Sequence, residues 1–374
     1  MTKKKICWVT PDWFVDVDMP IVPHLLDRYD ITWIITFPWR HNRFKEEDFK
    51  PYFGNPSLDI KFIHFKYYGL DPRNLEYYSV IKRIIRAVNP DLIYLNIEPG
   101  GPLILPFYRW LPTEKTIVTA HDGYVKSSFR HPWLAKKCFD LGYNTRSYIQ
   151  LFSNGEEAAF HKLRPSKKTF VIPLALKDFG KPTEKLREDF VTFASFGNIY
   201  EDKNIVLAIK AGEILYERGY RNFRIVIKGR CAEWEKDYAP LIKHPELIEA
   251  DLRFIDNSEI ANIYARNWYG LFPYKQSAQS GAIKVALNYD KPVIVSDLPG
   301  FLEDIKDGFN GYIFKNNDVD DLARVMEICI KNSRDKYNEL VKNVTQFVNN
   351  KYSSEKIISQ YVDMIEYVIS NSEK

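Results

Sequence analysis

Short runs of apolar, mostly β-branched residues alternate with amphipathic stretches along this chain of 374 residues. In the first half, such runs predict strands at residues 6–10, 31–37, 92–97, 116–120 and 148–152. Amphipathic patterns typical of helices lie between several of these runs. Strands that alternate with helices in this way indicate a parallel sheet covered by helices.

The same alternation starts again in the second half. A helix is predicted at 205–217, and strands are predicted at 191–197, 223–229, 252–255, 269–273, 292–296 and 311–314. A polar stretch at 177–185, which contains glycine and proline, lies between the halves and is the expected linker. The sequence therefore predicts an α/β protein with two Rossmann-like, doubly wound domains and an interdomain cleft.

We place the N-terminal domain at residues 1–176 and the C-terminal domain at 177–350. The last part of the chain, from residue 318 on, is helical by pattern. Its final helix, at 351–374, is long enough to cross back to the first domain.

Composition supports a globular protein and excludes extensive disorder, because 45% of the residues are hydrophobic and 27% are charged. The net charge of +4 is small for this length and is spread along the chain, so we expect no nucleic-acid partner. No segment reaches the roughly 20 apolar residues that span a bilayer. Any membrane contact is therefore expected to be peripheral.

The four cysteines, Cys7, Cys138, Cys231 and Cys329, lie far apart in the sequence. Their spacing argues against a zinc site and against a disulfide framework. It favours a reducing compartment, and we expect a cytoplasmic protein. The apolar run at residues 6–9 is too short for a signal peptide and is interpreted as the first strand.

Loops that follow the predicted strands are the expected location of site residues, because ligands of open α/β sheets bind at the carboxyl ends of strands. In the first half these loops contain Asp12, Asn96, His121 and Asp122. The imidazole of His121 could bond a substrate hydroxyl or carry a proton. A structural cap on the strand end is the equally weighted alternative.

In the second half, a loop that begins at Gly197 and Asn198 leads to Lys203, directly before the predicted helix. A lysine is unfavourable beside the positive end of a helix dipole. Its place there is explained if an anion such as a diphosphate lies between them. The alternative is an ordinary solvated lysine.

Two further loops offer groups for a phosphate. Lys228, Gly229 and Arg230 follow the next strand and add two cations. Residues 279–281, a Gln-Ser-Gly sequence at a predicted helix start, offer backbone N–H groups, although Ser-Gly is also an ordinary helix cap. Glu303 is expected to begin or cap the next helix, where a carboxylate is favourable without any ligand.

The order of motifs from residue 193 to 325 resembles the donor half of glycosyltransferase family 4, which has the GT-B fold. The motifs are Phe-Gly-Asn-x4-Lys-Asn, Ile-x-Gly, Phe-Pro-Tyr, Gln-Ser-Gly, Lys-Pro-Val-Ile-Val-Ser-Asp, Gly-x2-Glu-Asp-Ile and Asp-Gly-x-Asn-Gly. In the first half, only the Thr-Ala-His-Asp sequence at 119–122 and Ser153 are similar. The motifs are specific for the family and not for any sugar.

The resemblance implies a retaining transfer of a sugar from a UDP- or GDP-linked donor to a glycan or lipid-linked acceptor, with no cofactor and no required metal. The catalytic residues that it implies are Lys203, which would stabilise charge on the departing diphosphate, and His121, near the transferred sugar. Donor-binding positions fall on Gly197, Asn198, Lys228, Gly229, Arg230, Tyr274, Gln279, Ser280, Gly281 and Glu303. Acceptor-side positions fall on Asp12, Asn96 and Asp122.

The sequence also departs from the family pattern. Many members carry an arginine where this chain has Asn198, and paired glutamates where it has Ser277 and Val285. A branch of the family with the Ser-Gly form shows the same change, so donor recognition is expected to differ while activity is retained. The family's N-terminal glycine-rich loop is replaced by the sequence at 10–13.

The favoured hypothesis is a cytoplasmic enzyme that builds a cell-surface polysaccharide or glycolipid. A non-catalytic GT-B scaffold is the main alternative, and an epimerase or phosphorylase is less favoured because the lysine that a phosphorylase needs is not identified. Rings and cations at 37–45 would suit a peripheral contact with an anionic membrane. A solvated loop is the favoured interpretation of that segment.

Overall fold

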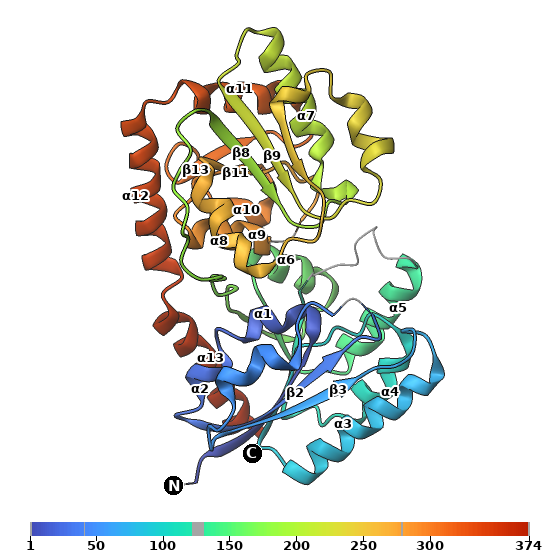
Figure 1. Cartoon of the computed structure of the whole chain (residues 1–374). Helices are drawn as coiled ribbons and strands as arrows, with labels where there is room; N and C mark the ends of the chain where they lie inside the picture. The colour runs from blue at the N-terminus through green and yellow to red at the C-terminus, as the bar shows by residue number, and fades with distance from the viewer. Residues whose placement is uncertain (1, 41, 122–130, 278–279, 373–374) are drawn as a thin grey trace. The chain divides into compact units, whose positions relative to one another are not determined.

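The computed structural model describes residues 2–40, 42–121, 131–277 and 280–372. Its contacts divide the chain into two compact units. The first unit contains residues 1–175 and 354–374, and the second contains 176–353. Figure 1 shows both units and labels many of their elements.

A seven-stranded sheet forms the centre of the first unit, in the order β3-β2-β1-β4-β5-β6-β7 with every pair of neighbours parallel. Its strands are β1 (Lys4–Pro11), β2 (Tyr29–Phe37), β3 (Leu58–His64), β4 (Leu92–Leu95), β5 (Thr116–Thr119), β6 (Tyr148–Leu151) and β7 (Lys168–Val171). Strands β4 and β5 and most of β1 are buried on both faces, which explains why they are rich in apolar and β-branched residues.

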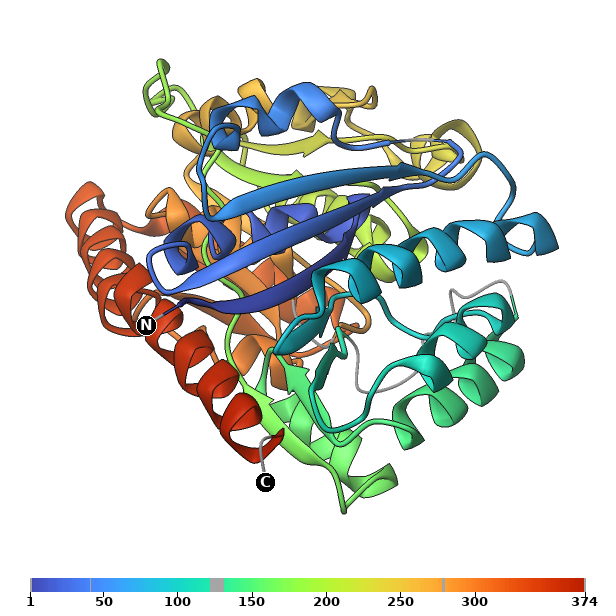
Figure 2. The same cartoon turned by 90° about the horizontal axis from the view of Figure 1, so that it is seen from below.

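The helices of this unit include two short ones after β1, namely α1 (Val15–Asp18) and α2 (Val22–Leu25). The longer ones are α3 (Leu75–Val88), α4 (Leu105–Trp110), α5 (Pro132–Asn144), α6 (Asn154–Leu163) and α13 (Ser354–Ser372). Helix α13, red in Figure 2, contacts α2 and β4. It buries Ile357, Tyr361 and Met364 at helical spacing, and the Tyr361 hydroxyl accepts a 2.9 Å hydrogen bond from Gln150.

The second unit contains a six-stranded parallel sheet in the order β10-β9-β8-β11-β12-β13. Its strands are β8 (Val191–Phe196), β9 (Phe223–Lys228), β10 (Ile248–Asp251), β11 (Tyr269–Phe272), β12 (Val293–Ser296) and β13 (Gly311–Phe314). Its helices are α7 (Ile205–Glu217), α8 (Asn257–Arg266), α9 (Gly281–Asn288), α10 (Pro299–Leu302), α11 (Val319–Lys331) and α12 (Arg334–Lys351).

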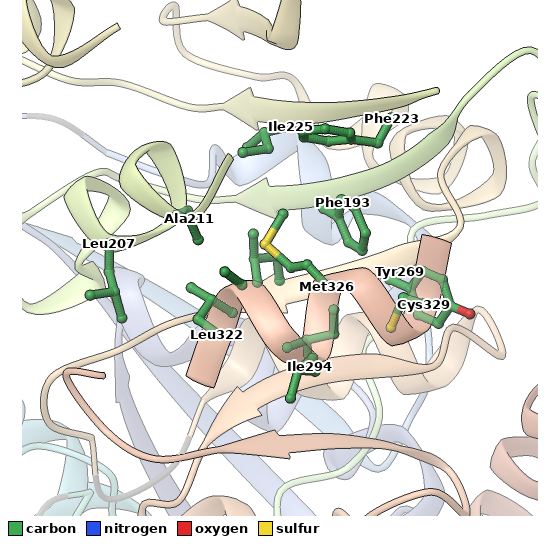
Figure 3. Close-up of a cluster of buried hydrophobic side chains, with 14 of the residues drawn as sticks. Phe193, Leu207, Ala211, Phe223, Ile225, Tyr269, Ile294, Leu322, Met326 and Cys329 are labelled. Carbon is green, nitrogen blue, oxygen red and sulfur yellow. The ribbon is translucent and has the colours of Figure 1, made fainter. Parts of the chain in front are cut away.

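One face of the second sheet packs against α7 and α11 (Figure 3). Strands β8, β9 and β12 contribute Phe193, Ile225 and Ile294, which pack in one cluster with Ala211 of α7 and Met326 of α11. All five side chains are fully buried or nearly so. This core fixes the strand ends from which the loops of the second unit emerge.

The α/β class with two parallel, Rossmann-like sheets is confirmed, and the predicted helix at 205–217 matches α7. One strand prediction is wrong and two strands were not predicted, all at sheet edges. The strand expected at 252–255 is wrong, because β10 ends at Asp251, and β3 and β7 were not predicted. In these edge strands most side chains are at least partly exposed, which breaks up the apolar pattern.

Each sheet has one point where the strand order reverses, between β1 and β4 in the first and between β8 and β11 in the second. Ligands of doubly wound sheets bind outside the carboxyl ends of the strands at this point. Asp12 and Asn96 directly follow β1 and β4, and Gly197 directly follows β8. The predicted site residues therefore lie where the topology of each unit favours ligand binding.

Candidate functional site

Two glycine loops touch at the carboxyl ends of the neighbouring strands β8 and β9, beside the reversal point of the second sheet. Gly197 and Gly229 have φ angles of 121° and 139°, in the region that favours glycine. A Cβ atom on Gly229 would lie 2.1 Å from the Gly197 carbonyl oxygen. Backbone bonds join the loops: Gly197 donates to the Lys228 carbonyl at 3.0 Å, and Ile199 donates to that of Arg230 at 2.9 Å. No side chain fits between them.

Lys203 lies beside this pair of loops, one residue before the αL residue that caps α7. The cap is Asn204, whose φ of 52° is tolerated by asparagine better than by most residues. The Lys203 ammonium lies 3.9 Å from the ring centroid of Tyr274 and 3.4 Å from the Asp202 carboxylate. The expected position of Lys203 at the start of a helix is confirmed.

A recess of about 10 Å³ brings together Gly197, Asn198, Lys203 and Tyr274. A space of this size holds about one water molecule. A diphosphate would therefore lie at the mouth of the recess, against the Lys203 ammonium and the backbone of the Gly197 loop.

The two other predicted cations of this region lie elsewhere. Lys228 pairs with Asp251 at 3.4 Å and lines a separate cavity of about 240 Å³, together with Arg187 and Glu259. Arg230 is exposed, and its guanidinium lies 5.5 Å from the ring centroid of Phe254. Neither side chain lines the recess at Lys203. The structure thus gives no sign that either one replaces the arginine missing at position 198.

The start of α9 lies in the same unit. Ser280 caps it, since its hydroxyl accepts a 3.4 Å hydrogen bond from the Ile283 N–H. A Cβ atom on Gly281 would lie 3.1 Å from the Lys177 ammonium, so that cation lies at the N-terminal end of α9. Sequence reasoning missed Lys177, because no local pattern connects it with a helix that begins at residue 281. Gln279, also predicted here, lies outside the described residues.

Glu303 is not at the start of a helix, and that expectation is wrong. Helix α10 begins at Pro299, which has the fixed φ that suits a first turn, and Glu303 is the C-cap. The next residue, Asp304, is buried and bonds Lys284 of α9, the Tyr352 hydroxyl and, at 2.7 Å, Lys351. Burial opposes ionisation of Asp304, but the two ammonium groups hold its pKa below the usual value. This network ties α9 to the end of α12.

In the first unit, His121 is 8% exposed and is stacked between two rings. Its centroid lies 3.5 Å from that of Phe14 and 4.6 Å from that of Phe152. Its Nε2 lies 2.6 Å from Oδ1 of Asn96, whose Nδ2 donates to the Asp18 carboxylate at 2.9 Å. Since that bond directs Oδ1 of Asn96 toward the histidine, Nε2 of His121 carries the proton.

Asp18 was missed because nothing in the sequence marks it as a partner of Asn96. It is fully buried, and its carboxylate also accepts a hydrogen bond from the Thr10 hydroxyl. Burial raises the pKa of Asp18 to about 6. A buried carboxyl, an amide and an imidazole thus form a line of hydrogen bonds at the reversal point of the first sheet.

The predicted acceptor-side residues have different surroundings. Asn96 is the centre of the hydrogen-bonded line. Asp12 is buried, and its carboxylate accepts hydrogen bonds from the backbone of Arg43 at 2.6 Å and Phe44 at 2.8 Å, so it holds the loop after β2. Burial raises the pKa of Asp12.

Asp122 lies outside the described residues. Ser153 caps α6 by accepting a bond from the Glu156 N–H at 3.1 Å.

Within the described ranges, no group of three or more His, Cys, Asp or Glu side chains could hold a metal ion. No helix in those ranges is both long and apolar enough to cross a membrane. All four cysteines are free thiols.

Residues 177–347 match the family model described as Glycosyl transferases group 1. This is nearly the whole of the second unit, and it contains the glycine loops, Lys203 and the start of α9. No curated protein gives a significant match in sequence.

Solved structures with a similar fold include HepE from Anabaena in complex with UDP and glucose. It has a TM-score of 0.69 at 15% identity, over 97% of this chain and 100% of that one. A glycosyltransferase from Rickettsia africae gives 0.72 at 16% identity, over 99% and 100%. Sucrose-phosphate synthase from Thermosynechococcus elongatus gives 0.77 at 13% identity, over 98% and 100%. The fold is GT-B, and the matched domain with these neighbours indicates a glycosyltransferase.

Proposed function

We propose that this protein is a retaining glycosyltransferase that moves a sugar from a UDP- or GDP-linked donor to a glycan or lipid-linked acceptor. The group 1 match and a neighbour solved with UDP and glucose support a nucleotide-sugar donor. The observation that carries this proposal is the recess in which the Gly197 loop meets Lys203, beside the reversal point of the second sheet. We assign the protein to cytoplasmic synthesis of a cell-surface polysaccharide or glycolipid, as a member of the Ser-Gly branch of family 4.

Lys203 stabilises the negative charge that develops on the departing diphosphate. An ammonium fixed against the Tyr274 ring is already in position and needs no reorganisation as the bond breaks. The backbone at Ser280 and Gly281 adds N–H donors, because the first N–H groups of a helix have no partner within that helix. No metal is needed in this proposal, since lysine and backbone dipoles supply the positive potential.

Lys177 supplies the second cation that the missing arginine would otherwise provide. Its ammonium lies at the N-terminal end of α9, next to the backbone N–H groups that a phosphate would contact. This explains how a chain with Asn198 could still hold a diphosphate. His121, held in one tautomer by Asn96, is assigned to the transferred sugar.

The first experiment measures the melting temperature of the full chain with UDP, GDP and uridine, with and without EDTA. A ligand that binds only the folded state raises the melting temperature by mass action. We expect one diphosphate to raise it in the presence of EDTA, and uridine, which lacks phosphate, to have a much smaller effect. A shift that EDTA abolishes would contradict the metal-independent mechanism.

The variant Lys177→Ala tests the second cation. We expect it to weaken binding of the diphosphate by about tenfold, which corresponds to about 1.4 kcal/mol. Lys181→Ala is the matched control, since Lys181 is an exposed lysine four residues away. If both variants and the parent bind the diphosphate with equal affinity, Lys177 does not contribute to the donor site.

A non-catalytic scaffold remains the second candidate, because Ser277 and Val285 stand where many family members have glutamates. It predicts no stabilisation by any nucleotide. It also predicts that His121→Ala and Lys203→Ala leave the biological activity unchanged. Nucleotide binding together with loss of sugar transfer in both variants would exclude it.

A further inference from the structure

A cavity in the first unit has walls made mainly of aromatic rings, and His121 is not among its lining residues. It has a volume of about 140 Å³ and lies at the carboxyl ends of β1, β2 and β4. Its rings belong to Trp13, Phe37, Trp39, Phe65, Tyr67 and Tyr78. A cavity of roughly 150 Å³ accommodates a single six-membered ring such as benzene. The space therefore suits one ring of a larger ligand.

Two rings of this cavity, those of Trp13 and Trp39, are exposed to solvent. Trp13 is 50% exposed and Trp39 is 40% exposed, although apolar side chains of this size are usually covered. The faces of aromatic rings carry negative charge, so they attract the weakly positive C–H groups of a saturated ring. A pyranose presents such C–H groups on its faces and hydroxyl groups at its edge.

One buried polar atom at the cavity has no partner in the described part of the chain. Asn74 lines the cavity and is 2% exposed. Its Nδ2 donates to the backbone carbonyls of Tyr67 at 3.3 Å and Tyr68 at 2.8 Å, but its Oδ1 accepts no hydrogen bond from the described residues. An unpaired buried acceptor costs free energy. A ligand hydroxyl that reached it after a small side-chain movement would supply the missing donor.

The cations beside the cavity indicate the charge of the ligand. The Arg40 guanidinium stacks over Trp39 at 3.9 Å from the ring centroid and forms no ion pair with any described carboxylate. The Arg73 guanidinium lies over Tyr67 at 3.8 Å but pairs with Asp71 at 2.6 Å. One cation is therefore available next to the aromatic walls. It would favour a sugar that carries a carboxylate or phosphate group.

We propose that this cavity binds one anionic pyranose unit of the acceptor, seated on the aromatic walls with its charge toward Arg40. This inference rests on the proposed function, because it treats the ligand as the acceptor of glycosyl transfer. It narrows the acceptor to a saccharide with an acidic or phosphorylated sugar near its reactive end. Asp12 contributes indirectly, since it holds the loop at 43–44 that follows the Trp39 and Arg40 segment.

The test measures binding of three sugars to the full chain by titration: methyl glucoside, methyl glucuronide and glucose 6-phosphate. We expect saturable binding of at least one anionic sugar, tighter than that of methyl glucoside. Trp39→Ala should weaken it by about tenfold or more, and Trp39→Phe, which keeps an aromatic face, should weaken it less. Arg40→Gln should remove the preference for the anionic sugar without changing the affinity for methyl glucoside.

Matched controls use residues away from the cavity. Trp133→Ala removes a tryptophan that is 63% exposed on α5, and Arg83→Gln removes an exposed arginine on α3. Both should bind the anionic sugars as the parent does. The proposal is overturned if no sugar binds up to its solubility limit, or if Trp39→Ala and Trp133→Ala bind equally well.

Two further measurements separate this proposal from its alternatives. UDP and GDP binding by the same variants reports on the donor site, so sugar binding without nucleotide binding would contradict the proposed function and leave the saccharide site intact. Nucleotide binding without sugar binding would contradict the site alone. Binding to phosphatidylglycerol vesicles that is lost in Trp39→Ala, with no sugar binding, would identify a membrane contact and overturn the saccharide site.

Discussion

The imidazole of His121 donates to Oδ1 of Asn96 over 2.6 Å, and the other end of the same amide donates to the buried Asp18. The amide has one acceptor and one donor end, so the Asp18 carboxylate determines which end faces the histidine. Phe14 and Phe152 hold the plane of the ring from both sides. His121 is thus fixed in both tautomer and orientation before any ligand binds.

Asp18 makes the stability of the first unit depend on pH. Its pKa is raised from 3.8 in the unfolded chain to about 6 by burial, so the folded state holds the proton more tightly. The contribution of Asp18 to the free energy of unfolding is fully present below about pH 4. It decreases by about 3 kcal/mol as the pH rises to about 6. Asp18→Asn cannot titrate at this position, so we expect its free energy of unfolding not to decrease in this way. The stability of the variant relative to the parent should therefore increase between pH 4 and 6.5.

Urea unfolding of parent and variant at several pH values measures this difference. Asp27→Asn, which changes an exposed carboxyl group in the same unit, is the control and should follow the parent. A constant difference between Asp18→Asn and the parent across this pH range would show that Asp18 titrates normally. Sugar transfer by Asp18→Asn should also fall, while nucleotide binding stays unchanged, because Asp18 acts through Asn96.

Lys203 is predicted to contribute mainly to the chemical step. Removal of one preorganised group that stabilises developing charge typically lowers kcat by about 100-fold to 1,000-fold. We expect Lys203→Ala to show such a loss, with a smaller effect on the affinity for the nucleoside diphosphate. Steady-state kinetics and nucleotide titration measure the two effects separately.

Lys210→Ala provides the comparison for Lys203, since Lys210 is an exposed lysine on α7. Its kcat should match that of the parent. Lys203→Arg should recover part of the lost rate, because it restores the charge but not the compact ammonium against Tyr274. Full activity of Lys203→Ala would end the assignment of a catalytic role to this residue.

The positions of residues in loops after strongly apolar strands could be predicted, because the local sequence pattern indicates where strands end and helices begin. The positions of His121 after a strand and of Lys203 before a helix were predicted in this way. Asp18 and Lys177 were not predicted, because the groups near them, Asn96 and the start of α9, lie far away in the sequence. Only the fold brings them close. Asp18 and Asn96 are 78 positions apart. Local signals also compete: acidic residues suggested a helix start at Glu303, but Pro299 had already begun that helix.

The contact between the glycine loops predicts a specific loss of stability. In Gly229→Ala the new Cβ would lie 2.1 Å from a backbone oxygen that cannot move without breaking the Gly197 bond to Lys228. We expect a destabilisation of about 3 kcal/mol or more, from the combined clash and backbone strain. Nucleotide binding should fall with it, since the same loop borders Lys203.

Gly219→Ala separates backbone strain from the clash. Gly219 also has a positive φ, of 94°, but a Cβ atom there would meet nothing within 4 Å. Its replacement should cost about 1–2 kcal/mol and leave nucleotide binding unchanged. If both variants lose the same stability, the close approach of the two loops does not contribute.

The buried group of Lys284, Asp304 and Tyr352 should matter more for the position of α9 than for overall stability. Lys284→Met leaves the Asp304 carboxylate buried with one cation fewer, and loss of one partner of a buried ion pair costs about 3–5 kcal/mol. The double variant Lys284→Met with Asp304→Leu removes both charges and should recover more than half of that loss. Its nucleotide affinity should nevertheless stay below that of the parent, because the network that ties α9 to Tyr352 is absent and the N–H groups at Gly281 are less fixed. Urea unfolding and nucleotide titration of the three proteins measure both effects, and a double variant that binds nucleotide as well as the parent would show that the network serves stability alone.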